Sequence, residues 1–536
     1  MSNSKNKTTQ ATTNPRMYPM PLPAKGSPDM LTHIDLRGVM ELAGRNLLSN
    51  LDLKQDFLPN WCVIPNPDGS VKVGKGWPGH NLGRWWDAML RLEEATGFHV
   101  PGDLKQAMLE NVYRFFDNSD SICIDPNASA CFELHSLREG MLALHALVRY
   151  RDDAWAKKKG HSMIETLLCA LHTDGSWNFE AFKTSSTHPN RLGRHYDPTG
   201  SHGRMLEALI WFYQATGDSA ALVLAQRSAE YHFANSTQAD GGLNLASKPD
   251  HTHSYLGTLR GLLLFGELTG QRQYIDTVSA TYEKIVRTLL KKSGFIGHDL
   301  TKDSGGETTS PGDAAQLALW LALRHNYTEY LDDVERIVRA RLVPCQISEL
   351  PPQIQSEFVP LLLGALGGCM GMPHGKKVAT TDVTAAVLHS LIDVYNNIVV
   401  ANETDLRVHF HFDYNDKNVC ITSRREKIAT VTITPKKKVN LWIRLPRWTP
   451  KESVRLVVAG KNLPLFIVGD YAFVPRDLMP AEVTLTYDLP VSTEIERTDG
   501  VDYSITWRGD EIIGISPNSD FLPFYPDAFD EHGGKQ

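Results

Sequence analysis

A helical hairpin recurs along most of the chain, and this repeat constrains the fold more than any other feature of the sequence. Apolar residues follow a helical spacing on both sides of short turns, as in "LIWFYQATGDSAALVLAQRSAEYH". The turns fall near residues 97, 152, 217, 270 and 327, a spacing of roughly 50–65 residues that exceeds the common solenoid periods. Such a unit fits two helices joined by one short loop and one long loop.

Six long loops, each placed before a helix, concentrate the polar chemistry of this part of the chain. They contain "WPGHNLGRWWD", "CFELHSLREG", "HYDPTGSHGRMLE", "DHTHSYLGTLRG", "GHDLTKDSGGETTSPGD" and "GGCMGMPHGKKVATTD". The short turns opposite them carry no comparable residues. If the hairpins close into a ring, these loops meet at one end around a single hollow. Six loops and repeated hairpins therefore predict an (α/α)6 toroid with its chemistry at one rim.

The pattern changes at about Leu406. Segments such as "IATVTITP", "VNLWIRLP" and "EVTLTYDLP" alternate apolar and polar residues, with Gly, Pro and Asp between them. Period-two segments at short spacing predict an antiparallel β-sandwich. We therefore expect an α+β multidomain protein with a disordered leader over 1–30, a toroid over 31–403, a β-sandwich over 404–521 and an irregular tail over 522–536.

The composition excludes several classes of partner. The chain of 536 residues has a formal net charge of -7, so no basic surface is available for nucleic acid. No apolar stretch reaches the 18 or so residues that span a bilayer, and the polar first residues lack the apolar core of a signal peptide. The seven cysteines are scattered and show no CxxC spacing, which indicates neither disulfides nor a zinc ribbon. We expect a cytoplasmic protein.

The first long loop contains residues suited to sugar binding. Its candidates are His80, Asn81, Arg84, Trp85 and Trp86. An aromatic face stacks on the C–H groups of a sugar ring, and an arginine can hold a carboxylate. We expect one of the two tryptophans to lie in the core and the other to face the hollow.

Two further loops concentrate titratable and cationic side chains. One carries His195, Tyr196, Asp197, His202 and Arg204, and the next carries His251, His253 and Tyr255. Asp197 precedes Pro-Thr-Gly and could serve only as a turn residue. The His-x-His pair lacks a third spaced ligand, so it is a weak metal signal, and we expect one of the two histidines to line the pocket.

The fifth loop supplies carboxylates. His298, Asp299 and Glu307 lie in a glycine-rich segment, where a carboxylate can approach a ligand closely. Burial there would raise the pKa of Glu307 towards that of a general acid. Asp303 and Asp313 could instead serve only as helix caps. A role as a cap explains Glu307 less well.

The order of these motifs resembles a known family. Helical hairpins, then "FIGHDLTKDSGGETT", then a Gly/Cys loop before "TTDVTAAVLHSLIDVYNNIVV", then a sandwich with "LWIRLPRW" and "YAFVPRDLMPAEVTLTYDLP", are similar to the β-L-arabinofuranosidase-like glycoside hydrolases (family 127 and relatives). The resemblance covers residues from about 35 to 520 and is most specific in the sandwich.

This resemblance implies a zinc site, from which the chain departs. The family binds zinc through a Glu, a Cys two residues later and a later Cys-Cys pair, one of which is the nucleophile. Here Glu307 matches the Glu, but Thr309 and Gly368 replace two of the cysteines, and Cys369 remains, with His374 nearby. We therefore expect no cofactor, with zinc only weakly supported. Three roles stay open for Cys369: nucleophile, pocket lining or buried small residue.

The leading hypothesis is a glycoside hydrolase, exo-acting on plant or microbial oligosaccharides, with carboxylate acid/base catalysis. Glu307 is the first carboxylate, and Asp197 or Asp299 is the second. The alternative is a lyase on uronate-containing glycans, in which a base from His195, Tyr196, His253 or Tyr255 acts beside the Arg204 carboxylate clamp. A third hypothesis is a sugar-binding protein without activity. The expected partner is a carbohydrate substrate, and the resemblance also suggests a homodimer.

Overall fold

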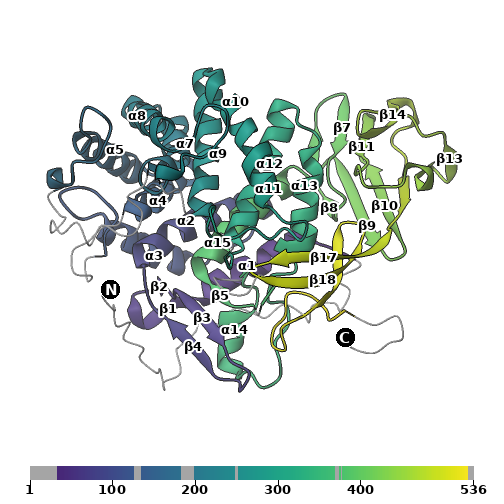
Figure 1. Ribbon diagram of the computed structural model, residues 1–536, viewed down its shortest axis with the longest axis horizontal. Helices are drawn as coiled ribbons and strands as arrows, with labels where there is room; N and C mark the ends of the chain where they lie inside the picture. Colours follow the sequence, from purple (N-terminus) through teal and green to yellow (C-terminus); the bar gives the residue numbers. More distant parts are fainter. Residues whose placement is uncertain are drawn as a thin grey trace.

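Twelve helices build a closed double ring. The computed structural model describes residues 33–125, 134–182, 198–247, 251–302, 304–367, 374–375 and 377–528, and the following applies to these. The inner helices are α2 (Pro78–Thr96), α4 (Leu137–Arg151), α7 (Leu206–Thr216), α9 (Thr252–Thr269), α12 (Thr309–His325) and α15 (Thr381–Asn396). Each contacts the next, and α15 contacts α2, which closes the ring (Figure 1). The predicted (α/α)6 toroid is therefore confirmed.

The outer helices run back between the inner ones. They are α1 (Leu36–Ser49), α3 (Gly102–Phe115), α5 (Ala154–Cys169), α8 (Ser219–Asn235), α10 (Arg272–Thr281) and α13 (Tyr330–Ile337). Helix α1 packs against α15 and so completes the sixth hairpin with the last inner helix. Shorter helices are α6 (Pro198–Ser201), α11 (Arg287–Leu289) and α14 (Val359–Leu362), and π-helical turns cover Tyr282–Val286 and Val338–Leu342.

Left-handed residues end five of the inner helices. The C-caps Gly97, Gly217 and Gly270 have φ of 75°, 71° and 69°, and Asp152 and Asn326 have φ of 51° and 65°. A residue with positive φ after the last turn allows the backbone to bond the free carbonyls and reverse direction. These five positions match the short turns predicted from the sequence. The long loops consequently lie at the other end, where the inner helices begin.

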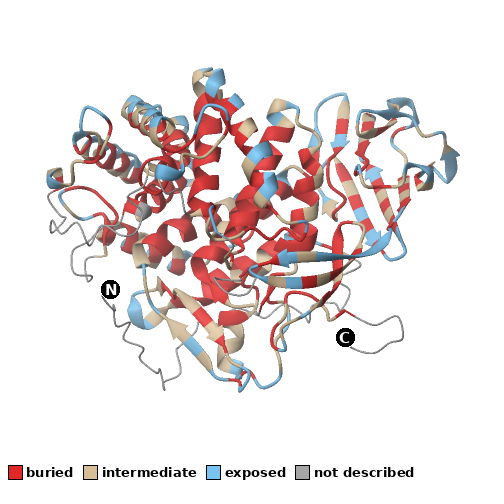
Figure 2. Cartoon of the chain, in the orientation of Figure 1, coloured by how far each residue is buried: buried red, intermediate tan, exposed pale blue. Residues whose placement is uncertain are grey.

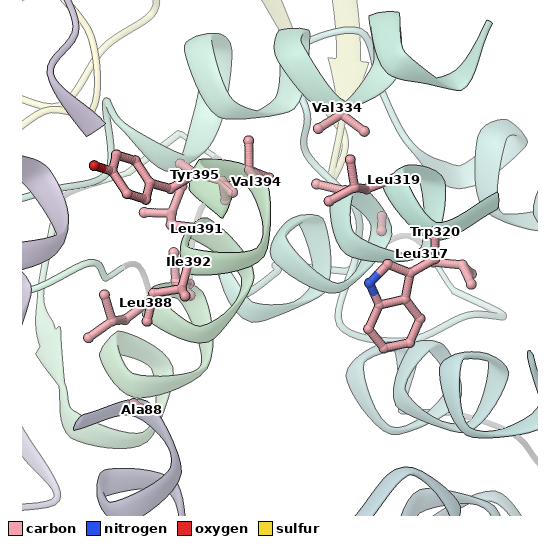
Figure 3. Close-up of a cluster of buried hydrophobic side chains, with 14 of the residues drawn as sticks. Ala88, Leu317, Leu319, Trp320, Val334, Leu388, Leu391, Ile392, Val394 and Tyr395 are labelled. Carbon is pink, nitrogen blue, oxygen red and sulfur yellow. The ribbon is translucent and has the colours of Figure 1, made fainter. Parts of the chain in front are cut away.

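The toroid is held together by apolar packing between neighbouring inner helices and between the two rings. Figure 3 shows Leu388, Leu391 and Ile392 of α15 near Ala88 of α2, with Leu319 of α12 facing Val334 of α13. All of these side chains are buried, with at most 3% of their surface exposed. Figure 2 accordingly shows the inner helices as mostly buried and the outer helices as exposed on one face. This pattern is the apolar stripe expected of amphipathic helices.

A small sheet ties together the two segments that enter α2 and α15. Strands β3 (Cys62–Pro65) and β4 (Val71–Gly74) form a hairpin, and β3 also pairs with β5 (Ala379–Thr380). A second pair, β1 (Leu51–Asp52) and β2 (Leu58–Pro59), lies just upstream. The beginnings of α2 and α15 are thereby fixed relative to one another by backbone hydrogen bonds.

Two sheets form the sandwich. The first has the order β13-β12-β16-β10-β9-β8 and the second β14-β15-β11-β7-β6. The strands are β6 (Val399–Ala401), β7 (Asp405–Val408), β8 (Tyr414–Asn415), β9 (Val419–Arg425), β10 (Ile428–Pro435), β11 (Asn440–Arg444), β12 (Arg455–Val458), β13 (Lys461–Leu463), β14 (Ile467–Val468), β15 (Tyr471–Val474) and β16 (Val483–Asp488). Alternate residues of β9 and β10 are buried, as the period-two pattern predicts. Only the β7–β11 pair, among the described strands, is parallel.

The last strands form a separate sheet rather than part of the sandwich. Strands β17 (Val491–Thr498), β18 (Val501–Arg508) and β19 (Glu511–Ser516) pair in that order. Figure 1 shows β17 and β18 crossing in front of the toroid, and Glu496 accepts hydrogen bonds from Ser293 at 3.0 and 2.6 Å. Downstream, the irregular segment that contains Phe524 and Tyr525 is buried against the molecule.

Buried ion pairs join the toroid to the sandwich. Glu335 of α13 contacts Arg444 of β11 and accepts a hydrogen bond from Arg339 at 2.9 Å. Arg425 of β9 pairs with Asp510, and all of these side chains are at most 4% exposed. Among the described helices, none is both long and apolar enough to cross a bilayer.

Candidate active site

The inner helices all begin at the end of the toroid where the long loops lie. Six helix N-termini therefore point towards the same region, and each presents its first-turn side chains and its positive dipole end to it. His80 and Arg84 come from α2, Arg204 precedes α7, and His253 lies in the first turn of α9. The structure brings these four predicted residues together. It also places beside them acidic residues that the sequence analysis did not select.

Glu139, in the first turn of α4, is the centre of a buried ionic network. Its carboxylate accepts hydrogen bonds from Arg84 at 3.2 Å, Arg138 at 3.1 Å and Arg204 at 2.5 Å, and it has no measurable exposure. Burial alone would raise the pKa of Glu139, but Arg204, His80, Arg84 and Arg138 together lower it well below its usual value. Glu139 is therefore a fixed negative charge.

The network continues to deeper levels of the toroid. Glu207 of α7 accepts hydrogen bonds from Arg138 and Arg260, each at 2.9 Å, and Arg260 also contacts Asp313 of α12. Burial raises the pKa of Glu207, but the two arginines outweigh it and bring the pKa to about 2. Asp313 is buried and ion-paired inside α12, so the expectation that it caps the helix is wrong. The charged side chains on these inner helices are thus paired with one another.

The hydrogen bonds of His253 define its protonation. Its Nε2 lies 2.6 Å from Arg84 Nη2, which can only donate, so Nε2 accepts. The proton therefore lies on Nδ1, which donates to Asp313. Burial, with Arg84 and Arg204 nearby, lowers the pKa of His253 well below its usual value. His253 is a neutral imidazole held between a cation and an anion, which suits positioning rather than proton exchange.

Glu307 lies two residues before α12, and 12% of its side chain is exposed. His251 Nε2 is 3.7 Å from Glu307 Oε1, and the His251 ring lies 4.6 Å from that of His298. Burial alone would raise the pKa of Glu307, but the side-chain contact with His251, together with the imidazole of His298, lowers it well below its usual value. The expectation of a raised pKa is therefore wrong, and Glu307 is ionised at neutral pH.

A chain of polar contacts connects this carboxylate to the buried network. Arg204 Nη1 donates to Ser254 Oγ at 2.9 Å, and Ser254 Oγ lies 2.6 Å from His251 Nδ1. Because arginine can only donate, Ser254 Oγ accepts from Arg204 and shares a second hydrogen bond with His251 Nδ1. This contact leaves Nε2 of His251 facing Glu307. The orientation of His251 is thereby set from the ionic network.

A second carboxylate lies at the same end of the ring. Asp382, in the first turn of α15, has 12% of its side chain exposed, and its Oδ2 is 3.6 Å from His80 Nε2. Its buried Oδ1 has no hydrogen-bond partner among the described residues. Burial lowers the pKa of His80, so this imidazole is neutral. Asp382 is the last residue of the sixth loop, and its place at the start of a predicted helix was the signal that could have identified it.

Several predicted residues serve the fold instead. Trp85 and Trp86 are 0% and 1% exposed, so both lie in the core and the expectation that one faces the hollow is wrong. His202 Nε2 donates to Gly175 O at 2.8 Å and its ring packs on Trp177. Tyr255 is fully buried, with its hydroxyl 2.9 Å from Thr237 Oγ1. Asp299 accepts hydrogen bonds from Thr301 within its own turn, which gives it a local structural role.

Two more predicted residues have local partners, and four are not described. Asn81 Nδ2 donates to Gly76 O at 3.2 Å, and His374 lies 3.2 Å from Arg341 and 3.5 Å from Glu496 of β17. Burial lowers the pKa of His374 to about 4. The remaining predicted residues lie outside the described part of the chain; these are His195, Tyr196, Asp197 and Cys369.

The described residues do not fit the zinc site that the family resemblance implies. Thr309 occupies the position of a ligand cysteine, and its buried hydroxyl has no hydrogen-bond partner among the described residues. No group of three or more His, Cys, Asp or Glu side chains in this part of the chain could hold a metal ion. A neutral hydroxyl is a poor substitute for a thiolate ligand of zinc. We therefore assign no catalytic step to a metal.

Comparison with known proteins gives the fold a precedent. No family model and no curated protein matches the chain. Among solved structures, it is similar to a protein described as a glycoside hydrolase, with a TM-score of 0.53 and 14% identity over 81% of this chain and 77% of that one. It is also similar to a GH127 beta-L-arabinofuranosidase from Geobacillus stearothermophilus T6, with a TM-score of 0.52 and 12% identity over 81% and 76% of the two chains.

The chain shares the fold of these hydrolases. At 12–14% identity the similarity concerns the fold alone. The resemblance to the GH127 enzymes that the sequence motifs suggested is confirmed at this level.

Proposed function

We propose that the protein is a glycoside hydrolase whose reaction takes place where the inner helices begin. The observation that carries the proposal is Glu307, an ionised and partly exposed carboxylate at the start of an inner helix of a hydrolase-like toroid. The network around Glu139 supports it, because that network holds His251 and His253 rigidly beside the carboxylate. Catalytic groups need this kind of support from the residues behind them.

The chemistry follows from the two carboxylates. Glu307, whose pKa is lowered, suits the nucleophile or the general base, which attacks the anomeric carbon or activates water. The general acid, which protonates the departing glycosidic oxygen, is then Asp382 or the undescribed Asp197. Asp382 replaces Asp299 as the candidate among the described residues. The neighbouring imidazole of His80 is neutral and can form a hydrogen bond with Asp382 when Asp382 gives its proton to the glycosidic oxygen.

Product analysis tests the reaction class. The protein is incubated with oligosaccharides from arabinan, rhamnogalacturonan, gums and uronate-rich glycans, and new reducing ends are measured together with absorbance near 235 nm. New reducing ends without absorbance support hydrolysis. Absorbance that rises with cleavage would mean β-elimination and would overturn the proposal. Tyr255 is a poor candidate for the base of a lyase, because its side chain is buried and its hydroxyl is hydrogen-bonded to Thr237.

Replacement of Glu307 tests its role. Glu307→Gln keeps the size of the side chain but removes its charge, so we expect the turnover of any cleaved substrate to fall by about 10²–10⁴-fold. Glu110→Gln, on the exposed side of α3, is the matched control and should retain full activity. Full activity of Glu307→Gln would contradict the assignment.

The same proposal includes the mode of cleavage, the oligomeric state and the cellular location. Exo action on oligosaccharide ends follows from the expected hollow of the toroid, and a homodimer from the family resemblance. The five described cysteines are free thiols, as in proteins of a reducing compartment, which supports a cytoplasmic location.

A further inference from the structure

A pair of tryptophans lies beside the candidate site, and neither was selected from the sequence. Trp77 directly precedes α2, and 44% of its surface is exposed, whereas Trp61 precedes β3 and is partly exposed. Their ring centroids are 5.2 Å apart. The ring of His80 lies 5.5 Å from Trp77 and 6.4 Å from Trp61. The pair thus stands next to the histidine that contacts Asp382.

The backbone around both tryptophans is fixed by hydrogen bonds. Trp61 N donates to Gly74 O at 2.9 Å, and Thr381 N donates to Trp61 O at 3.1 Å. Asn81 N donates to Trp77 O at 3.0 Å, while its side chain bonds Gly76 O. Trp77 also has a φ of 42°, which is uncommon for a bulky residue and costs conformational energy. The backbone that carries this large exposed side chain is thus held in one place by the surrounding structure.

The position of the pair within the ring determines which part of a substrate it can reach. Glu307 precedes α12, Asp382 begins α15, and Trp77 precedes α2, so one inner helix separates the tryptophans from Glu307. Neighbouring helix axes are about 8–10 Å apart. A sugar ring whose bond is broken at Glu307 and a sugar ring stacked on Trp77 therefore lie at different inner helices. A sugar further along the same chain can stack on Trp77.

We propose that Trp61 and Trp77 form a platform that binds a sugar residue remote from the cleaved bond, so that the protein prefers oligosaccharides to short glycosides. This inference rests on the proposed function for its place in catalysis. An indole face presented to solvent matches the C–H face of a sugar ring, and a preorganised aromatic surface loses little entropy on binding. The platform contributes affinity for longer chains and takes no part in the chemical step.

The test compares chain lengths in binding and in turnover. Affinity is measured by calorimetry with the oligosaccharide series named above, from disaccharide to hexasaccharide, using Glu307→Gln to prevent turnover. Adding Trp77→Ala should weaken binding of the longest members at least tenfold and that of the disaccharide less than twofold. In the active protein, Trp77→Ala should raise KM for long chains and leave kcat nearly unchanged, and Trp77→Phe should restore most of the affinity.

The outcomes separate the platform from the proposed function. Trp442→Phe, a partly exposed tryptophan of the sandwich, is the matched control and should change nothing. Equal effects of Trp77→Ala on short and long chains, or no effect, would overturn the platform even if the protein is a hydrolase. Trp77-dependent binding without any cleavage would retain the platform and refute the hydrolase. Absence of both binding and cleavage refutes both.

Discussion

At the scale of single residues, Glu307 and His251 determine how the site responds to pH. Glu307 is ionised because the imidazoles around it outweigh its burial. A carboxyl whose folded-state pKa is lowered stabilises the fold above its unfolded pKa, about 4.3, and this contribution is lost as the pH falls through the folded pKa. Activity that needs the carboxylate therefore persists to acidic pH.

Removal of His251 should reverse this behaviour. In His251→Asn the burial of Glu307 remains while its nearest imidazole is gone, so the pKa of Glu307 rises. We expect the acidic limb of the kcat/KM profile to move to higher pH, with circular dichroism confirming that the protein stays folded. His325→Asn, at the opposite end of α12, should leave the limb in place. An unshifted limb in His251→Asn would show that another group holds the pKa of Glu307 down.

Glu139 is the residue on which the buried charges depend most. Glu139→Gln leaves Arg84, Arg138 and Arg204 without their common anion, so we expect the free energy of unfolding to fall by about 3–5 kcal/mol. Urea denaturation measures the change. Asp276→Asn breaks the Arg272 pair on the surface, where the two side chains are 58% and 76% exposed, and should lower the free energy of unfolding far less than Glu139→Gln does. Equal losses in the two variants would contradict the role of the network.

At the scale of elements, close helix crossings position the network. A Cβ at Gly83 of α2 would lie 1.8 Å from the backbone oxygen of Glu139 in α4. The two helices can therefore approach closely only because position 83 has no side chain, and this approach brings Arg84 to Glu139.

Gly83→Ala tests this crossing. The added methyl must push α2 and α4 apart, so we expect a loss of about 1–3 kcal/mol or more of stability, together with a fall in activity. Thermal denaturation and the oligosaccharide assay measure the two effects. Gly102→Ala, where an added Cβ meets nothing within 4 Å, should be neutral. A neutral Gly83→Ala would mean that the helices tolerate a wider spacing.

The elements were easier to predict than the residues of the site. Turn residues such as Gly97 and Gly217 mark the hairpins because their conformation is local, so the sequence alone predicts the toroid. The direction of a side chain on a helix depends on the helix phase, which spacing does not determine to better than one turn. One of the two tryptophans, Trp85 and Trp86, was therefore misplaced, and Glu207, inside a helix, looks like an ordinary amphipathic position.

At the scale of the whole molecule, the ion pairs at the junction make the toroid and the sandwich one unit. Arg444→Met leaves Glu335 and Asp332 without their shared cation, so we expect the sandwich to melt separately from the toroid in calorimetry. Arg455→Met, at an exposed position of strand β12 of the sandwich, should keep the original transition. A single unchanged transition in Arg444→Met would show that apolar contacts alone join the two parts.

The pairing of α1 with α15 has a consequence for how the protein is made. The outer helix of the sixth hairpin leaves the ribosome first among the ring helices, and its inner partner leaves last. Until α15 has been synthesised, the apolar faces of α1 and α2 lack their neighbour, and contacts between segments this distant form slowly. Closure of the ring is therefore a late, long-range step, during which the nascent chain exposes surface that chaperones recognise.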